Sequence, residues 1–224
     1  SNLAGVTPSR ATFATLPLPG IQPCIMDNDG NELNNLNVEG KLCIKFPWPS
    51  MARTIYGDHK RFKDTYFSTF ENMYFTGDGC IRDNEGMYRI TGRVDDVIIV
   101  SGHNLGTAEI ESAIDEHPNV CETAIVGYPH KIKGNAIYAF VIAQGDIKNE
   151  INIRAEINNL IVKNVGPIAK VEKIQFVKGL PKTRSGKIMR RILRKIASND
   201  FSNFGDTSTL LDPNVVEEII REKI

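Results

Sequence analysis

The sequence predicts an α+β protein in two parts: a β-rich first part, then a small α+β domain in which helices flank a central sheet. In residues 1–94, apolar runs alternate with the Asn/Asp/Gly clusters 27–30 and 83–86, whose residue types favour hairpin turns. In residues 95–224, short apolar runs alternate with segments of helical periodicity, which is typical of a sheet with helices packed on it. We place the boundary, and with it a hinge, near Asp95.

The first part is expected to contain four strands. The segment Pro47-Trp48-Pro49 cannot be a central strand, because proline lacks the N–H group that a sheet requires. The predicted strands are 21–26, 41–46, 72–75 and 87–91.

The second part is expected to alternate between strands and helices. Thr107 is a suitable helix N-cap, and Pro118 ends the helix that follows it. A last helix is expected to begin near Lys187, with an apolar face that includes Ile192 and a basic face that includes Arg191. The predicted strands are 97–100, 122–127, 137–143 and 173–178, and the other predicted helices are 107–117 and 150–164.

Composition narrows the class of protein. Basic and acidic residues both total 27, so the formal net charge is zero; seven of the basic residues lie in 182–195, which leaves 20 basic against 27 acidic residues elsewhere. The chain as a whole is therefore not a binder of nucleic acid. No apolar run approaches the roughly 20 residues of a membrane span, so no membrane partner is expected. The cysteines, Cys24, Cys43, Cys80 and Cys121, are scattered, which favours free thiols in a reducing compartment.

The basic stretch 182–195 contains the strongest candidate for chemistry. Ser185-Gly186 forms a flexible turn, and Lys187 follows it, so one ammonium group can be directed at a phosphate or a carboxylate. The glycine spacing excludes a P-loop, because six residues separate Gly179 from Gly186 and Ile188 replaces the required Ser or Thr. The remaining basic side chains are expected on the helix surface and at a domain interface.

Three further motifs are candidates for ligand contact. Asp78 lies between two glycines and can approach paired hydroxyls such as those of a ribose, although a plain turn is the alternative. Arg93 offers a fork of donors to phosphate or sugar oxygens, with a salt bridge as the alternative. Ser101-Gly102 lies between a strand and a helix, where backbone N–H groups favour anions, unless it is a simple tight turn.

Together, in this order and spacing, the motifs resemble the AMP-forming acetyl-CoA synthetases of the adenylate-forming enzyme superfamily. The resemblance extends from about Pro17 to the C-terminus. The motifs that carry it are Tyr-Phe-Thr-Gly-Asp-Gly (74–79), Ile-Thr-Gly-Arg-Val-Asp-Asp (90–96), Val-Ser-Gly-His-Asn-Leu-Gly-Thr-Ala-Glu-Ile-Glu (100–111) and Leu-Pro-Lys-Thr-Arg-Ser-Gly-Lys-Ile-Met-Arg-Arg (180–191).

This resemblance implies a two-step ligase with the substrates ATP, acetate and coenzyme A (CoA). Acetate attacks ATP to give acetyl-adenylate and pyrophosphate, and the CoA thiol then displaces AMP. Lys187 would be catalytic in the first step, and its acetylation, by an acetyltransferase and reversed by a deacetylase, would switch the enzyme off. The small domain would turn about Asp95 between the two steps.

The resemblance also implies roles for individual residues. Asp78, Arg93 and Asn104 would bind ATP or AMP; Ser101, Gly102 and Val162 would bind CoA; backbone at Asp115, His117 and Val120 would bind Mg²⁺. Two of these residues depart from the family pattern, since Asn104 and Val162 stand where arginines are common. Lys163 is a substitute for the charge lost at Val162.

The resemblance further implies that an N-terminal domain of the same enzyme precedes residue 1. The chain is expected to be a C-terminal fragment, inactive alone, of an enzyme found in the cytoplasm, with the nucleus as a second expected location. Two alternatives remain: an adenylate-forming enzyme with another short acyl substrate or a carrier-protein acceptor, and a basic nucleic-acid-binding module built on residues 182–195. The last would bind in a strongly salt-dependent manner.

Overall fold

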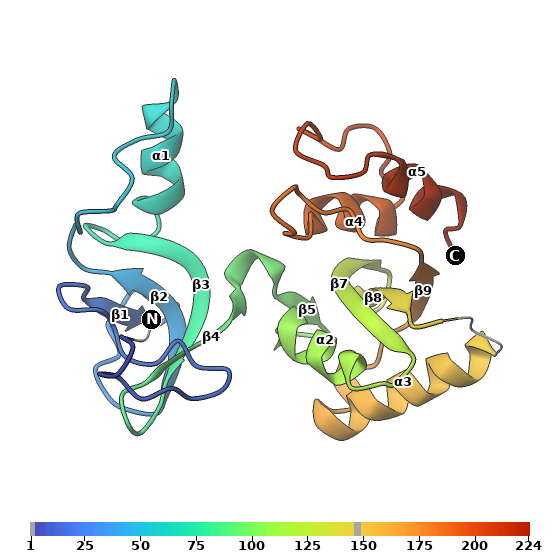
Figure 1. Cartoon of the computed structure of the whole chain (residues 1–224), viewed down its shortest axis with the longest axis horizontal. Coiled ribbons are helices and arrows are strands. Elements are labelled where there is room, and N and C mark those ends of the chain that lie inside the picture. The colour runs from blue at the N-terminus through green and yellow to red at the C-terminus, as the bar shows by residue number, and fades with distance from the viewer. Residues whose placement is uncertain (1–2, 146–148) are drawn as a thin grey trace. The chain divides into compact units, whose positions relative to one another are not determined.

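The chain divides into two compact units, Ser1–Asp95 (unit 1) and Asp96–Ile224 (unit 2). The structure, a computed structural model, describes residues 3–145 and 149–224. Figure 1 labels the elements of both units. Each unit is described by itself below.

Unit 1 is built on an antiparallel four-stranded sheet in the order β1-β2-β3-β4. Beside the predicted strands it contains a helix that the sequence analysis did not assign. That helix is largely polar and buries Phe62 alone, so it shows little helical periodicity. The elements are β1 (Pro23–Met26), β2 (Val38–Ile44), α1 (His59–Tyr66), β3 (Tyr74–Arg82) and β4 (Tyr88–Arg93), followed by a 3₁₀ turn (Val94–Asp96) that ends at the first residue of unit 2.

Unit 2 is built on a five-stranded sheet. The order β6-β5-β8-β7 is antiparallel, and β9 joins β8 in parallel. The elements are β5 (Ile98–Val100), β6 (His103–Leu105), α2 (Thr107–Asp115), β7 (Val120–His130), β8 (Gly134–Ala143), α3 (Glu150–Asn164), a 3₁₀ turn (Pro167–Ala169), β9 (Lys173–Val177), α4 (Arg190–Ala197) and α5 (Asn214–Arg221). The prediction of an α+β fold with helices flanking a sheet is confirmed.

The helices cover both faces of this sheet. Ile110 and Ile114 of α2 and Ile157 of α3 pack in one apolar cluster with Ile125 and Ala139 of the sheet. On the opposite face, α4 and α5 pack in a second cluster with neighbouring sheet residues, including Ala124 and Phe140. Because successive residues of a strand point to opposite faces, the apolar run 124–126 of β7 serves both clusters. The helices lie above and below the sheet in Figure 1.

Two local predictions are wrong. Thr107 is not the N-cap of α2: Gly106 occupies that position, and Thr107 is the first helical residue, 6% exposed. The last helix does not begin near Lys187 but at Arg190, because residues 182–188 form a hairpin, with a bridge between Lys182 and Ile188.

The prediction of free thiols is confirmed. All four cysteines are unpaired; Cys24, Cys43 and Cys80 are buried and Cys121 is exposed. Burial raises the pKa of Cys43 to about 12 and that of Cys80 to about 11. These two thiols therefore stay protonated at neutral pH and belong to the packing of unit 1.

Candidate functional site

Lys187 closes a tight turn whose backbone is held on both sides. The Thr183 N–H donates to the Lys187 carbonyl at 2.9 Å, and the Lys187 N–H donates to Thr183 Oγ1 at 3.1 Å. The Gly186 N–H donates to the Thr183 carbonyl at 2.8 Å, and Gly186 has φ +82°, which favours glycine. The Lys187 residue is exposed. A fixed backbone thus presents a solvated ammonium group.

Most other basic side chains of 182–195 are engaged elsewhere in unit 2. Within residues 3–145 and 149–224, no ion pair is formed by Arg184 or Lys187. The engaged side chains are Lys182 with Glu122, Arg190 with Glu111, Arg191 with the carbonyls of Phe204 and Asp206, Arg194 with Asp96, and Lys195 with Asp200. Most of the basic side chains that were expected on the helix surface therefore contact partners within unit 2.

The Lys187 turn is attached to α4, and α4 is attached to the sheet. Arg190 contacts both carboxylate oxygens of Glu111 at 2.8 Å, and Glu111 Oε1 also accepts the Ile125 N–H at 2.9 Å. Burial raises the pKa of Glu111, while hydrogen bonds and the charge of Arg190 oppose the rise. The pair joins α2, β7 and α4 three residues after Lys187.

The Ser101-Gly102 pair forms the turn of the β5–β6 hairpin. Both residues have positive φ, +49° and +83°, which is the signature of a type I′ turn, and Val100 pairs with His103 across it. The Ser101 N–H donates to the Lys133 carbonyl at 3.0 Å, which fixes the hairpin beside the β7–β8 turn. Asn104 follows on β6 and is exposed.

The two turns lie at opposite ends of the same sheet. The Lys187 turn is tied to the start of β7, since Lys182 pairs with Glu122 at 2.5 Å. The Ser101 turn is tied to the end of β7, since Lys133 lies between His130 and β8. From Glu122 to His130 the strand spans roughly 26 Å. Unit 2 therefore presents two separate candidate surfaces.

In unit 1, Asp78 and Arg93 are paired neighbours on β3 and β4. Arg93 Nη1 lies 3.4 Å from Asp78 Oδ1 and donates to the Thr76 carbonyl at 3.1 Å, and Arg93 Nε donates to Asp95 at 3.0 Å. A side chain at Gly77 would collide with the guanidinium, because a Cβ there falls 2.6 Å from Nη2. Burial raises the pKa of Asp78, and the charge of Arg93 opposes the rise.

The position of Asp78 corrects one expectation. The predicted strand 72–75 would leave Asp78 beyond its end, but β3 continues to Arg82 and Asp78 lies within it. A register shift between Gly79 and Cys80 interrupts the pairing there. Gly79 also needs to be a glycine, since a Cβ would fall 2.6 Å from Thr91 Oγ1.

The residues proposed for Mg²⁺ lie between α2 and β7. His117 is 3% exposed; its Nε2 lies 3.0 Å from Glu156 Oε2, and its Nδ1 accepts the Asn119 N–H at 3.1 Å. Both ring nitrogens are thus engaged, and burial raises the pKa of Asp115. In the described part of the chain, no three His, Cys, Asp or Glu side chains form a group that fits a metal ion. The expected Mg²⁺ contacts are backbone atoms, which this observation on side chains does not test, so they stay a prediction.

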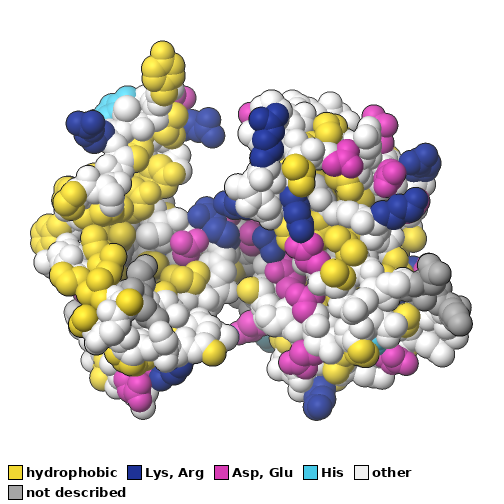
Figure 2. Space-filling model, viewed as in Figure 1, with side chains coloured by type: hydrophobic (Ala, Val, Ile, Leu, Met, Phe, Trp, Pro, Cys, Tyr) yellow, Lys and Arg dark blue, Asp and Glu magenta, His cyan; other side chains and the backbone are white. Residues whose placement is uncertain are grey.

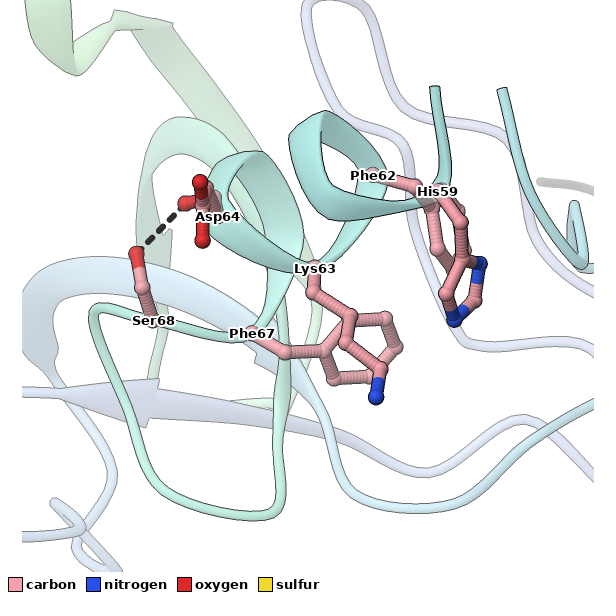
Figure 3. A pocket seen from close by; sticks show the side chains of 6 residues that line it. All are labelled: His59, Phe62, Lys63, Asp64, Phe67 and Ser68. Atoms are coloured by element: carbon pink, nitrogen blue, oxygen red, sulfur yellow. Dashed lines mark hydrogen bonds between the residues drawn. The ribbon is translucent and has the colours of Figure 1, made fainter. Parts of the chain in front are cut away.

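Unit 1 also has two surface hollows that contain none of the predicted site residues. Figure 3 shows one of about 450 Å³ on α1, lined by His59, Phe62, Lys63, Asp64, Phe67 and Ser68. A second, of about 180 Å³, is lined mostly by apolar residues that include Leu16, Leu42 and Ile90. Figure 2 shows hydrophobic side chains gathered over the face of unit 1 in view, and acidic and basic side chains interspersed on unit 2.

Three residues that shape the site were not singled out from the sequence. Thr183 fixes the backbone of Lys187, Glu111 holds Arg190, and Asp96 holds Arg194. The sequence gives no signal for these two ion pairs, because the partners lie far apart along the chain. Glu111 and Arg190 are 79 positions apart, and Asp96 and Arg194 are 98 positions apart.

Part of the chain matches a known protein family. The AMP-binding enzyme C-terminal domain family matches residues 109–187, which include Glu111, Val162 and Lys187. The matched residues all lie in unit 2. Val162 lies on α3 and is 40% exposed, and its contact with CoA stays a prediction.

Curated relatives extend the similarity over nearly the whole chain. Acetyl-coenzyme A synthetase of Escherichia coli is 56% identical over 221 residues, which cover 99% of this chain and 34% of that protein. The Methylorubrum populi and Brucella canis acetyl-coenzyme A synthetases are 55% and 54% identical, with the same coverage. The chain thus corresponds to the C-terminal part of these proteins and spans about a third of their length.

Solved structures share the fold. An anthranilate CoA ligase in complex with anthranoyl-AMP matches 85% of this chain with a TM-score of 0.74 and 25% identity. An amide bond synthetase from Marinactinospora thermotolerans matches 82% with a TM-score of 0.70 and 26% identity. Acetoacetyl-CoA synthetase from Streptomyces lividans, at 21% identity, matches 94% with a TM-score of 0.81 and shows the fold alone. None of the described helices is long and apolar enough to cross a membrane.

Proposed function

We propose that this chain supplies the C-terminal part of a cytoplasmic, ATP-dependent acetate–CoA ligase. Acetate and ATP would form acetyl-adenylate and pyrophosphate, and the CoA thiol would then displace AMP to give acetyl-CoA. The support is 54–56% identity to acetyl-coenzyme A synthetases over 99% of the chain. Magnesium enters this reaction with ATP, as part of the substrate.

The observation that carries the proposal is the contrast between Lys187 and its basic neighbours. Lys187 is exposed on a hydrogen-bonded turn, whereas five of the seven basic side chains of 182–195 are bound inside unit 2. In the first step its ammonium group would contact the acetate carboxylate and the α-phosphate as negative charge develops between them. A positioned cation that meets charge in the transition state accelerates the step. Acetylation of Lys187 removes this charge, which would inactivate the enzyme.

The second step would use the other end of the sheet. Ser101 and Gly102 form an exposed turn with positive φ, and their backbone would line the path of the CoA thiol. Turning unit 2 about Asp95 would exchange the Lys187 turn for this one. The separation of roughly 26 Å along β7 supports a large rotation, because a side-chain movement could not exchange the two turns.

The nucleotide would be held by unit 1. Asp78 would accept hydrogen bonds from the ribose hydroxyls, and Arg93 would hold the Asp78 carboxylate while it contacts the nucleotide. Asn104 would meet AMP by hydrogen bonding without a positive charge. At the CoA nucleotide, Lys163, next to Val162 and exposed in the last turn of α3, would supply the charge that valine lacks.

The test is to produce the sequence as the C-terminal part of a full-length enzyme and measure AMP formation. We expect AMP formation that depends on acetate, ATP and CoA, with less activity on propionate and butyrate, and none from the 224-residue chain alone. Activity of the isolated chain would refute the fragment proposal. Preference for a longer acid, or transfer to a carrier-protein thiol in place of CoA, would favour the alternative adenylate-forming enzyme.

A further inference from the structure

We propose that Arg194 is a positioning residue: its ion pair with Asp96 fixes the unit 2 side of the hinge and transmits the turning of the hinge to the Lys187 turn. This inference rests on the proposed function for its consequence in catalysis. Its structural part, the ordering of residues 96–100 by Arg194, is independent of that function.

Two consecutive carboxylates flank the bond at which the chain divides. Asp95 Oδ1 lies 3.0 Å from Arg93 Nε within unit 1, and Asp96 Oδ1 lies 2.8 Å from Arg194 Nη2 within unit 2. Each side of the Asp95–Asp96 bond thus has its own guanidinium contact. The connection itself is a single 3₁₀ turn, Val94–Asp96, and such a turn has poorer hydrogen-bond geometry than an α-helix.

The two ion pairs differ in exposure. The Asp96 side chain is 13% exposed, whereas that of Asp95 is 67% exposed. An exposed pair contributes little because water and salt screen it. A largely buried carboxylate that loses its partner is left without compensation for its lost hydration. The contact of Arg194 with Asp96 is therefore the firmer of the two.

Helix α4 connects this contact to Lys187. Arg190 and Arg194 are four positions apart and so lie on one side of the helix, where they hold Glu111 and Asp96. The opposite side buries Ile192 and Ile196 in the core. Because α4 begins three residues after Lys187, one helix connects the Lys187 turn to the Arg194 contact with Asp96.

The first experiment measures hydrogen–deuterium exchange of the chain itself. We compare Arg194→Gln with Lys195→Gln, a matched control whose cation pairs with the half-exposed Asp200. Peptides covering 96–100 should exchange about fivefold faster in Arg194→Gln and should be unchanged in Lys195→Gln. Equal exchange in the two variants would overturn the structural part of the inference.

The second experiment measures both half-reactions of the full-length enzyme. Arg194→Gln should change the ratio of adenylation to thioester formation by about fivefold, because the hinge no longer directs the rotation, and Lys195→Gln should leave it unchanged. The reversed pair Asp96→Arg with Arg194→Asp should restore the ratio, which a merely structural loss would not.

The outcomes separate the two proposals. If the unaltered full-length enzyme forms no acetyl-CoA, the proposed function fails, and the exchange experiment still decides the role of Arg194. If the enzyme is active but both half-reactions fall equally in Arg194→Gln, the positioning role is wrong. Failure of the reversed pair to restore the ratio, with the fold intact by circular dichroism, overturns it as well.

Discussion

The Lys187 turn and the Ser101-Gly102 turn are alike in form and different in what they present. Each is a short hairpin turn with a glycine at positive φ, and each is attached to one end of the same sheet. The first presents a charged side chain on a fixed backbone, whereas the second presents the backbone itself. The difference suggests one small domain that serves an electrostatic step with one end and a ligand path with the other.

The attachments of the two turns also differ. The Lys187 turn is followed by α4, whose apolar side is buried in the core and whose Arg190 binds the largely buried Glu111. The Ser101 turn is attached through the Lys133 carbonyl to a surface network in which Lys133, His130 and Tyr128 contact Glu172. Four changes to the molecule would test this contrast.

Replacing the charged group of the first turn should have the largest effect. Lys187→Ala in the full-length enzyme should lower the rate of adenylation by about 100- to 1000-fold, since a cation aimed at transition-state charge is removed. Thioester formation from supplied acetyl-adenylate should stay within about twofold. Pyrophosphate release and thiol consumption measure the two steps.

Arg184→Ala is the matched control for Lys187→Ala. Arg184 is exposed in the same turn, and its N–H donates to the Thr209 carbonyl, a bond that the variant keeps. Both half-reactions should be nearly unchanged in Arg184→Ala. Equal loss of both steps in Lys187→Ala would contradict the assignment of Lys187 to the first step.

Weakening the attachment of α4 to the rest of unit 2 should have the next largest effect. Glu111→Gln keeps the shape of the side chain but removes the charge that faces Arg190, which should lower the free energy of unfolding by about 2 kcal/mol. Lys195→Gln, which breaks an exposed pair, should change it by no more than about 0.5 kcal/mol. Urea denaturation of the chain measures both; similar losses would show that burial does not distinguish these pairs.

Straining the backbone of the Ser101-Gly102 turn should slow the second half-reaction, whereas Lys187→Ala slows the first. Gly102 has φ +83°, which a β-branched residue adopts only with strain, so Gly102→Val should slow thioester formation by about tenfold and spare adenylation. Gly86→Val imposes similar strain in unit 1, where φ is +77° and the added Cβ meets nothing within 4 Å. If Gly86→Val has the same effect on the step ratio, the loss reflects general strain.

Lowering the pH should weaken the surface network beside Ser101, and the resulting loss of stability should be the smallest of the four effects. The hydrogen bond from Lys133 lowers the pKa of Glu172, so its contribution to stability is present above the ordinary value of 4.5 and is lost as the pH falls through the lower folded-state pKa. We expect a loss below about 1 kcal/mol, because the site is partly solvated.

The control for this pH dependence is Glu172→Gln. In this variant the free energy of unfolding should fall less between neutral pH and acid, because the Glu172 carboxylate whose protonation contributes to the fall is absent. The Glu111–Arg190 pair responds in the opposite sense: burial raises the pKa of Glu111, so this group binds its proton more tightly in the folded state. A variant Glu172→Gln with an unchanged acid profile would show that the network does not contribute.

Long elements with a regular apolar pattern are predictable from the sequence. Two helix predictions fail where the same residues also suit another local structure. Helix 150–164 and the strands β5, β7, β8 and β9 follow from their apolar patterns, whereas β6 is not predicted. Helix α5 was missed because its Val215, Val216 and Ile219 are β-branched residues that suit strands equally well. The start of α4 was misplaced because Thr183 bonds Lys187 and draws residues 182–188 into a hairpin.

The α+β fold class and the motifs around Asp78, Arg93, Ser101 and Lys187 follow from the sequence, since they depend on local spacing and residue type. The basic side chains that are bound inside unit 2 become visible only in the folded structure. The partners of Lys182, Arg190 and Arg194 come from 60, 79 and 98 positions away. Such pairing follows from the packing of α4 against the sheet, because folding brings together charges that no local pattern connects.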